Sequence, residues 1–340
     1  MREKRNWLAR KKMELTLSRV IEFYHSALEL EGKSINTIEW YQQKLEAFLS
    51  FLQLSSQQIL VRDLSLYDGR AFIRSLMERD TLFDNHPWRE EVQRRLSPHT
   101  IHGYVRTLRA FASWLEEEGY TDENIFKRLK LPKLPETLIQ PLTEDEIKRI
   151  LFAIPRDTTM GVRNYAIVLL FLDTGIRISE LANLKLDDIE FGEGHFKVFG
   201  KGARERIVPM GITAQRAVIR YMERSRPEPV NPSENRLFLT DSGDPMSKNS
   251  TGKVIQRLAR RAEVHRLHPH LFRHTFAVRY LKNGGDVFSL QKILGHKSLD
   301  VTRRYVQLAG TDLKEKHRLF SPVDNLGLAG RRRGRPRQQR

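Results

Sequence analysis

The stretch IEFGEGHFKVFGKGARERIVP, residues 189–209, is the part of the chain that departs most clearly from a helical pattern. Short apolar runs alternate with polar residues here, and glycines separate the runs. The apolar residues are Ile189, Phe191, Phe196, Val198, Ile207 and Val208, and the glycines are Gly192, Gly194, Gly200 and Gly202. Alternation broken by glycine turns is typical of short antiparallel strands. The stretch therefore predicts a small sheet of about three strands.

On both sides of this sheet the apolar residues follow helical spacing. The clearest helix opens at Ser97 as N-cap with Pro98 in the first turn, and it closes at Gly119. Residues 35–52 carry a similar stripe, residues 14–30 and 63–79 carry weaker ones, and helical patterns return from Ser250. The predicted fold class is mainly α with a small antiparallel β-sheet.

Three prolines, Pro132, Pro135 and Pro141, favour an extended connector over a helix. Thr143 and Glu146 then stand at capping-box spacing and predict the start of a new helix. The expected organisation is a basic N-terminal arm at 1–12, a helical domain at 13–129, a proline-containing linker at 130–142, a mixed domain at 143–320 and a basic tail at 321–340.

The composition indicates a polyanionic partner. The chain has 340 residues, with 59 Lys and Arg against 42 Asp and Glu, so its formal net charge is +17. It has no Cys, which excludes disulfides, thiolate zinc sites and a cysteine nucleophile. The longest apolar run, residues 166–172, is far shorter than the roughly 20 residues of a membrane span. We expect a soluble, cytoplasmic protein.

Four separated pieces of the second domain offer groups suited to a phosphodiester, and one of them offers a hydroxyl that can attack it. His270 and Arg273 stand three apart after Pro269, so a helix would place both on one face, where they could bind one phosphate. Each group alone has an ordinary explanation, such as a surface arginine, a turn lysine or a packed tyrosine. The six residues are Arg177, Lys201, His270, Arg273, His296 and Tyr305.

Histidines cluster near the same point, and a zinc site from His268, His270 and His274 is conceivable by residue type. The chain has no Cys and no HExxH arrangement, so we expect no metal. We interpret His274 as a core histidine bonded to the backbone.

Taken together and in order, the six residues resemble those of the tyrosine recombinase (phage integrase) family, in its Xer-like or transposon-borne integrase branch. The resemblance is carried by TGIRISEL (174–181), HLFRHTFA (270–277) and LGHKSLDVTRRY (294–305), and it covers roughly residues 143–320. Two departures are small. Phe272 stands where leucine is commoner, and Gln307 stands where many members have histidine.

The resemblance implies a helical core-binding (SAM-like) domain and an α+β catalytic domain. It implies a site-specific recombinase that cleaves and rejoins DNA strands through a 3'-phosphotyrosyl intermediate formed by Tyr305, without a cofactor. Lys201 would protonate the leaving 5'-oxygen, and Arg177 and Arg273 would hold the transition-state charge. Glu180 is a candidate to orient an arginine or a histidine, and an ordinary carboxylate at a helix start is the alternative. The implied partners are double-stranded DNA, further copies of the chain, as a tetramer in the synapse, and accessory proteins. The implied location is the cytoplasm, at the nucleoid.

The segment Arg333-Gly334-Arg335-Pro336-Arg337 is similar to the core of an AT-hook, which inserts into the narrow minor groove of A·T-rich DNA. Arg333, Arg335 and Arg337 are therefore candidate DNA-binding residues. A basic tail that contacts phosphates anywhere is the alternative, and it stays open.

Two other functions compete with recombination. A type IB topoisomerase shares the catalytic residue types and relaxes supercoils, and a DNA-binding relative would hold sites together without cutting. The Xer-like motifs and the presence of all six groups favour the recombinase. Integration, excision and dimer resolution stay open as outcomes.

Overall fold

A computed structural model describes most of the chain. The described residues are 12, 14–53, 59–82, 92–134, 139–200, 205–296, 298–309, 317, 321–323 and 326. Their contacts divide the chain into two compact units, Met1–Thr137 and Leu138–Arg340, each with its own core. The division falls within residues 130–142, where the prolines predict a connector. The limits of the domains given above stay predictions.

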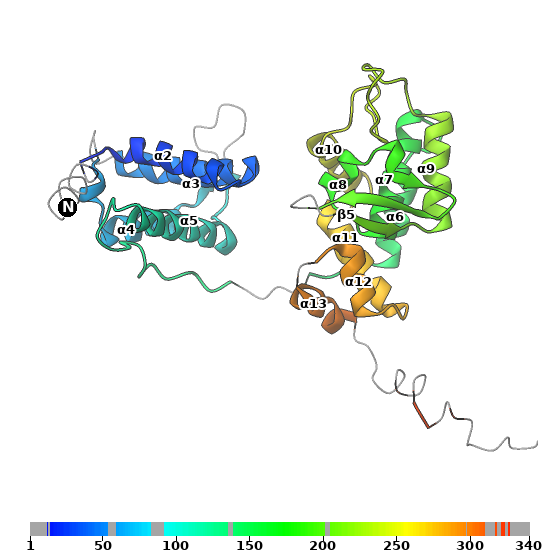
Figure 1. The fold of residues 1–340 in the computed structure, drawn as a ribbon. Coiled ribbons are helices and arrows are strands. Elements are labelled where there is room, and N and C mark those ends of the chain that lie inside the picture. The colour runs from blue at the N-terminus through cyan, green and yellow to red at the C-terminus, as the bar shows by residue number, and fades with distance from the viewer. Residues whose placement is uncertain are drawn as a thin grey trace, which may run out of the picture. The chain divides into compact units, whose positions relative to one another are not determined.

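The first unit is a helical bundle in which α2 and α3 form one layer and α4 and α5 pack beside it (Figure 1). Its elements are α2 (Leu17–Leu30), α3 (Ile35–Gln53), a 3₁₀ turn (Val61–Asp63), α4 (Leu66–Glu78), β1 (Thr81–Leu82), β2 (Val92–Gln93) and α5 (Pro98–Glu117). The antiparallel pair β1–β2 is absent from the sequence prediction, because strands of two residues are too short to show an alternating pattern.

The ends of α5 confirm the helix signals in the sequence. The hydroxyl oxygen of Ser97 accepts a hydrogen bond from the backbone nitrogen of Thr100 at 3.2 Å. Beyond the helix, Gly119 has a φ of 70°, the left-handed conformation that favours glycine. Buried aromatic residues from different helices, including Phe48, Phe72 and Phe111, fill the core of the bundle.

The second unit mixes helices with one three-stranded sheet (Figure 1). Before the sheet come α6 (Glu144–Phe152), α7 (Thr159–Thr174), α8 (Ile178–Asn183) and a 3₁₀ turn (Leu186–Asp188). The sheet consists of β3 (Ile189–Glu190), β4 (His195–Phe199) and β5 (Glu205–Pro209). After it come α9 (Ile212–Arg224), α10 (Lys248–Arg261), α11 (Pro269–Lys282), α12 (Val287–Leu294) and α13 (Leu299–Ala309).

The sheet confirms the antiparallel arrangement expected from the glycine-separated runs. Its order is β3-β4-β5, and Phe196 stands opposite Val208. Of the two adjacent apolar residues in β5, Val208 is buried while Ile207 is 56% exposed. Successive side chains of a strand point to opposite faces, so Val208 defines the inward face of β5.

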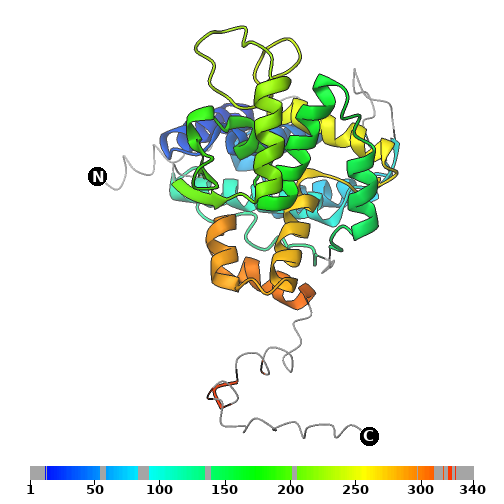
Figure 2. The ribbon, with the colours of Figure 1, turned by 90° about the vertical axis from the view of Figure 1, so that its right-hand side faces the viewer.

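Helix α7 runs through the centre of the second unit, packed against α9 and α11 (Figure 2). The rings of Phe171 on α7 and Phe272 on α11 are stacked, with centroids 5.6 Å apart and planes at 5°. Phe272, one of the departures from the family pattern, is thus fully buried. Burial of a phenylalanine contributes about 1.5–3 kcal/mol, so this contact fixes α11 against α7.

The last three helices, α11, α12 and α13, gather at one end of the second unit (Figure 2).

Thr143 begins α6 with the expected capping box, in which its hydroxyl oxygen accepts from the Glu146 nitrogen at 3.2 Å. The helices and the three-stranded sheet together confirm the predicted fold class, which is mainly helical with a small antiparallel sheet. No helix in the described part of the chain is long and apolar enough to cross a membrane.

Candidate active site

A left-handed glycine ends α7 and brings Arg177 to the start of α8. Gly175 has a φ of 60°, and a Cβ at this position would lie 2.6 Å from the ring of Phe276. Glycine is therefore required both for the turn and for the close approach. Arg177 follows as N-cap of α8, and its Nη1 donates to Oε1 of Glu180 at 2.8 Å.

Glu180 is a buried carboxylate shared by two arginines. Nη1 and Nη2 of Arg206 donate to its two oxygens, both at 2.8 Å, while Arg177 also donates to it through its backbone nitrogen at 2.9 Å. Burial alone would raise the pKa of Glu180, but the hydrogen bonds and charges of Arg206 and Arg177 outweigh it and lower the pKa to about 2. Glu180 is thus ionised at neutral pH and holds both arginines.

Arg206 is a residue of this cluster that the sequence analysis missed. It lies on β5 two positions before Val208, so the strand directs both side chains to the inward face. An arginine on the buried face of a strand needs an anionic or hydrogen-bonding partner. The inward position of Arg206 in the strand pattern is the sequence feature that could have identified it.

Arg273 is the most deeply buried of the arginines in the cluster, with 4% of its surface exposed. Its Nη1 donates to the carbonyl oxygen of Gly175 at 2.8 Å, and its Nη2 donates to that of Leu294 at 2.6 Å. Burial, followed by the charge of Arg177, lowers the pKa of Arg273 to about 10. The guanidinium therefore remains protonated at neutral pH.

The C-terminal end of α12 gathers the three arginines. The last four carbonyls of an α-helix lack partners within the helix, and this end carries partial negative charge. Backbone nitrogens of the turn at Gly295 and His296 satisfy the first two of these carbonyls. Arg206 Nε binds the carbonyl of Ile293 at 2.8 Å and Arg273 binds that of Leu294, while Arg177 Nη2 approaches that of Gly295 at 3.5 Å.

His296 and Tyr305 lie next to each other after this turn. The His296 Nδ1 is 3.0 Å from the hydroxyl oxygen of Thr302, which fixes the ring. The rings of His296 and Tyr305 are roughly parallel, with centroids 6.1 Å apart, and His274 meets Tyr305 edge-on at 5.1 Å. Burial and the charges of Arg273, Arg177 and Arg206 lower the pKa of His296 to about 4. The imidazole is therefore neutral at pH 7.

The two histidines of α11, His270 and His274, differ in their exposure to solvent. His270 is exposed in the first turn, after Pro269 begins the helix as expected, and desolvation followed by the charge of Arg273 lowers its pKa. His274 is 9% exposed, and its Nε2 is hydrogen-bonded to the carbonyl of Ile139. This confirms the interpretation of His274 as a core histidine bonded to the backbone.

The structure thus brings together Arg177, Glu180, Arg273, His296 and Tyr305 from four separate segments. Lys201 lies outside the described residues, in the sequence gap between β4 and β5. The tail arginines Arg333, Arg335 and Arg337 lie outside them as well.

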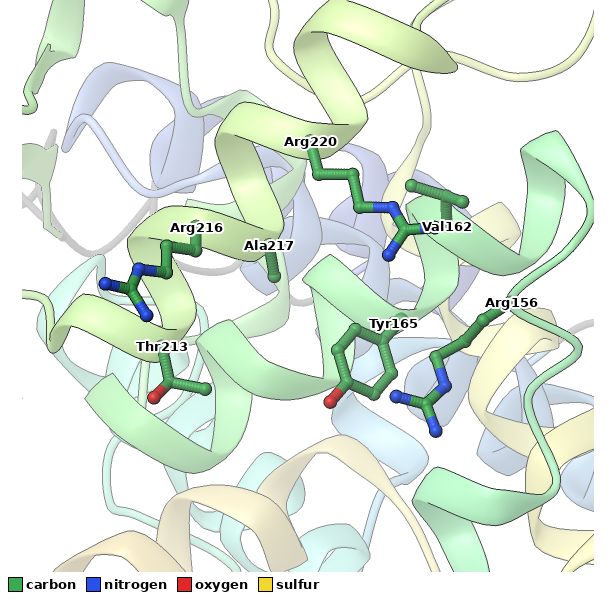
Figure 3. A pocket seen from close by; sticks show the side chains of 7 residues that line it. All are labelled: Arg156, Val162, Tyr165, Thr213, Arg216, Ala217 and Arg220. Carbon is green, nitrogen blue, oxygen red and sulfur yellow. The ribbon is translucent and has the colours of Figure 1, made fainter.

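A second group of arginines lines a pocket between α7 and α9 with a volume of about 270 Å³ (Figure 3). Its lining residues are Arg156, Val162, Tyr165, Thr213, Arg216, Ala217 and Arg220. The guanidinium of Arg156 lies 5.0 Å from the ring centre of Tyr165. None of these residues belongs to the cluster around Glu180, so the pocket is a separate feature of the surface.

Chemically, the cluster combines fixed cations, neutral imidazoles and one phenolic hydroxyl. Cations fixed in advance stabilise the negative charge that develops when a nucleophile attacks phosphorus. The hydroxyl of Tyr305 is the group that can form a covalent bond to phosphorus. Such an arrangement of side chains can support phosphoryl transfer.

Comparison with known proteins identifies the class. The model of the phage integrase family matches residues 140–311, and the chain belongs to this family. It is a tyrosine recombinase, an enzyme of DNA recombination that acts site-specifically on DNA. The sequence-based predictions of family, activity and enzyme class are confirmed.

Among its relatives is tyrosine recombinase XerC of Oceanobacillus iheyensis, which is 32% identical over 319 residues, covering 92% of this chain and 98% of the relative. Tyrosine recombinase XerD of Listeria monocytogenes is 28% identical over 304 residues, covering 88% and 97%. The crystal structure of a lambda integrase dimer bound to a COC' core site has the same fold, with a TM-score of 0.66 and 17% identity over 89% of this chain and 80% of that one.

Proposed function

We propose that Tyr305 attacks a DNA phosphodiester and becomes linked to the 3' side of the break. The observation that carries this proposal is the position of the Tyr305 ring beside His296, in the cluster that also holds Arg177 and Arg273. The bond from the tyrosine oxygen to phosphorus forms as the bond from phosphorus to the 5'-oxygen breaks. The released 5'-hydroxyl of another strand later reverses the step, so the number of phosphoester bonds is conserved.

Arg177 and Arg273 would bind the non-bridging oxygens of the phosphate. A guanidinium has five N–H groups, and Arg273 uses two of them on carbonyls, which leaves three for a ligand. The side chain of Arg177 is 34% exposed, so DNA can reach it. Glu180 would orient Arg177 without touching the phosphate, because both of its oxygens are taken by arginines.

The histidines and Lys201 would manage protons and hydrogen bonds. With their pKa values lowered, His270 and His296 are neutral and can each donate one hydrogen bond to the phosphate or accept the tyrosine proton. Lys201 would donate a proton to the leaving 5'-oxygen.

At the level of the whole chain, we propose that the helical domain at 13–129 and the catalytic domain at 143–320 bind one duplex, joined by the linker at 130–142. Four copies would act on two DNA sites in the synapse. A lambda integrase dimer on its core site supports an assembly of several copies, although the likeness to that structure concerns the fold alone. The proposed place of action is bacterial DNA in the cytoplasm, at the nucleoid, with accessory proteins as further partners.

The tail is proposed to strengthen binding through Arg333, Arg335 and Arg337. A minor-groove hook would favour A·T-rich flanks, whereas a basic tail that contacts phosphates would not discriminate between flanks. Removal of residues 331–340 should weaken DNA binding and leave cleavage of bound DNA unchanged. Binding curves on duplexes with A·T-rich and G·C-rich flanks separate the two modes.

The proposed chemistry is tested with a nicked suicide duplex that carries the binding site. Proteolysis of the trapped complex and mass spectrometry identify the side chain that bears the nucleotide, and Tyr305 is the expected one. Attachment to any other residue would refute the assignment.

The role of Lys201 is tested on the same duplex. Lys201→Ala should slow cleavage by about 10²- to 10⁴-fold, because the leaving alkoxide is no longer protonated. A bridging 5'-sulfur, a better leaving group, should restore much of this loss, and it should not do so for Arg177→Ala. Equal rescue of both variants would remove Lys201 from the role of general acid.

A further inference from the structure

We infer that Arg206 is a positioning residue of the reaction, because it joins Glu180 on α8 to the end of α12 and so holds Arg177 and His296 in their places. The inference rests on the function proposed above. In this role Arg206 neither contacts DNA nor transfers a proton.

All three guanidinium nitrogens of Arg206 already donate. Nε donates to the carbonyl of Ile293, and Nη1 and Nη2 donate to the two oxygens of Glu180, each at 2.8 Å. The side chain is 13% exposed. The side chain of Arg177, by contrast, is 34% exposed and makes one hydrogen bond shorter than 3 Å to the residues that the structure describes. Arg177 is therefore accessible to a phosphate, whereas Arg206 is occupied by protein groups.

The partners of Arg206 lie directly beside proposed catalytic groups. Oε1 of Glu180 accepts from Arg206 and from Arg177 at the same distance, 2.8 Å, so a shift of Arg206 moves the carboxylate that aligns Arg177. Ile293 lies three residues before His296, at the end of α12. One side chain thus links three segments that are distant in sequence.

Gly295 allows this contact to form. It has a φ of 64°, and a Cβ at this position would lie 3.1 Å from the Cδ and Nε of Arg206. The turn therefore packs directly on the arginine side chain. Displacement of Arg206 would release the turn from which His296 projects.

The geometry also explains why the residue is an arginine. A planar guanidinium can bind both oxygens of a carboxylate and still direct Nε elsewhere, whereas a lysine ammonium is a single point of charge. Arg206→Lys keeps the charge but loses at least one of these three hydrogen bonds. Either the carbonyl of Ile293 loses its donor, or a Glu180 oxygen keeps only the hydrogen bond from Arg177. The remaining catalytic groups are unchanged in identity and lose only their alignment.

The experiment compares Arg206→Lys with Arg163→Lys in the full-length protein. Arg163 is a matched control, since it is 5% exposed and its Nη1 donates to the carbonyl of Leu239 and to Asp241, both at 2.9 Å, outside the cluster. Three quantities are measured for each: the affinity for the duplex, the melting temperature, and the single-turnover cleavage rate at saturating DNA.

Arg206→Lys should slow cleavage of bound DNA by about 10- to 100-fold, the scale expected when reacting groups shift by about 1 Å, with affinity changed less than about threefold. Arg163→Lys should lower the melting temperature and leave this rate within about twofold. A purely structural role for Arg206 predicts the same behaviour in both variants. That result, or a wild-type cleavage rate in Arg206→Lys, would overturn the inference.

A second variant keeps the inference testable if Arg206→Lys does not fold. Glu180→Gln removes the same link while it keeps the size of the side chain, and it should cause a comparable loss of rate. The double variant should be no slower than the slower single variant, because both changes break one connection. Additive losses would contradict the shared role. The proposed function fails separately, by absence of the Tyr305 adduct in the unmodified protein.

Discussion

The second unit contains two groups of three arginines that differ in how they are held. In the cluster, Arg177, Arg206 and Arg273 bind Glu180 and the carbonyls at the end of α12. In the pocket of Figure 3, the side chains of Arg156, Arg216 and Arg220 make no hydrogen bond or ion pair to any part of the chain that the structure describes. The protein therefore holds the guanidinium groups of the cluster through anionic partners and backbone carbonyls. Those of the pocket are exposed, with Arg156 beside the ring of Tyr165.

The difference shows how a group of cations can be held together before a ligand arrives. Like charges repel, so three guanidinium groups stay together before DNA arrives only if anionic groups hold them. A buried carboxylate and a helix C-terminus supply this in the cluster, and the cations need no reorganisation during the reaction. In the pocket the arginines remain solvated, so their orientation must be established anew for any ligand.

The largest difference between the two groups should appear on removal of an arginine from the cluster. Arg273→Ala should reduce the cleavage rate of bound DNA by about 10²- to 10³-fold, since it removes a fixed donor to the transition state. Arg216→Ala, the control from the pocket, should leave the rate within about twofold. The rates are measured in single turnover at saturating DNA, and similar losses in both variants would erase the distinction.

Acid should weaken the unit that holds the cluster. The pKa of His296 is lowered from 6.5 to about 4, so between these pH values the unfolded chain binds a proton that the folded chain does not, and stability falls as pH falls. Glu180, lowered from 4.5 to about 2, adds a further loss below pH 4.5. The free energy of unfolding measured in urea should therefore be lower at pH 5 than at pH 7.

His296→Gln isolates the contribution of the imidazole. Its loss of stability from pH 7 to pH 5 should be smaller than that of the unmodified protein. Arg216→Gln, a change in the pocket of the same unit that alters no histidine, serves as control and should retain the full loss. An identical pH dependence in His296→Gln would show that His296 does not hold a lowered pKa.

The smallest effect is expected in the pocket itself. Arg216, Arg220 and Arg224 follow one another at intervals of four on α9, and each such like-charge pair costs about 0.2–0.5 kcal/mol. Arg220→Gln removes two of these pairs and should slightly stabilise the protein, whereas Arg224→Gln removes one and should do so less. Thermal unfolding measures both, and a clear destabilisation by Arg220→Gln would indicate that its charge has a partner.

Much of the fold was predictable because its signals are local. The N-cap at Ser97, the capping box at Thr143 and the glycine-separated strands each depend on a few neighbouring residues. The hairpin β1–β2 was not predicted, since its strands are too short to show a pattern.

The candidate residues of the site were predictable from the sequence, whereas the contacts between them were not. The motifs predicted the candidate residues, and the fold brings Arg177, Arg273, His296 and Tyr305 together. The part played by Arg206 could not be read from the sequence, because its partners Glu180 and Ile293 lie 26 and 87 positions away. The alternation of the strand could have shown only that the side chain of Arg206 shares the inward face with Val208. Contacts that join distant segments depend on packing, which no local pattern records.

The most direct test of the account is the comparison of the unmodified protein with Tyr305→Phe on a nicked suicide duplex. Loss of one hydroxyl leaves the arginine cluster and the ring contacts intact, so DNA binding should be retained. The unmodified protein should give a covalent protein–DNA band on a denaturing gel, and Tyr305→Phe should give none. A covalent band of comparable yield from Tyr305→Phe would contradict the central claim that Tyr305 is the nucleophile.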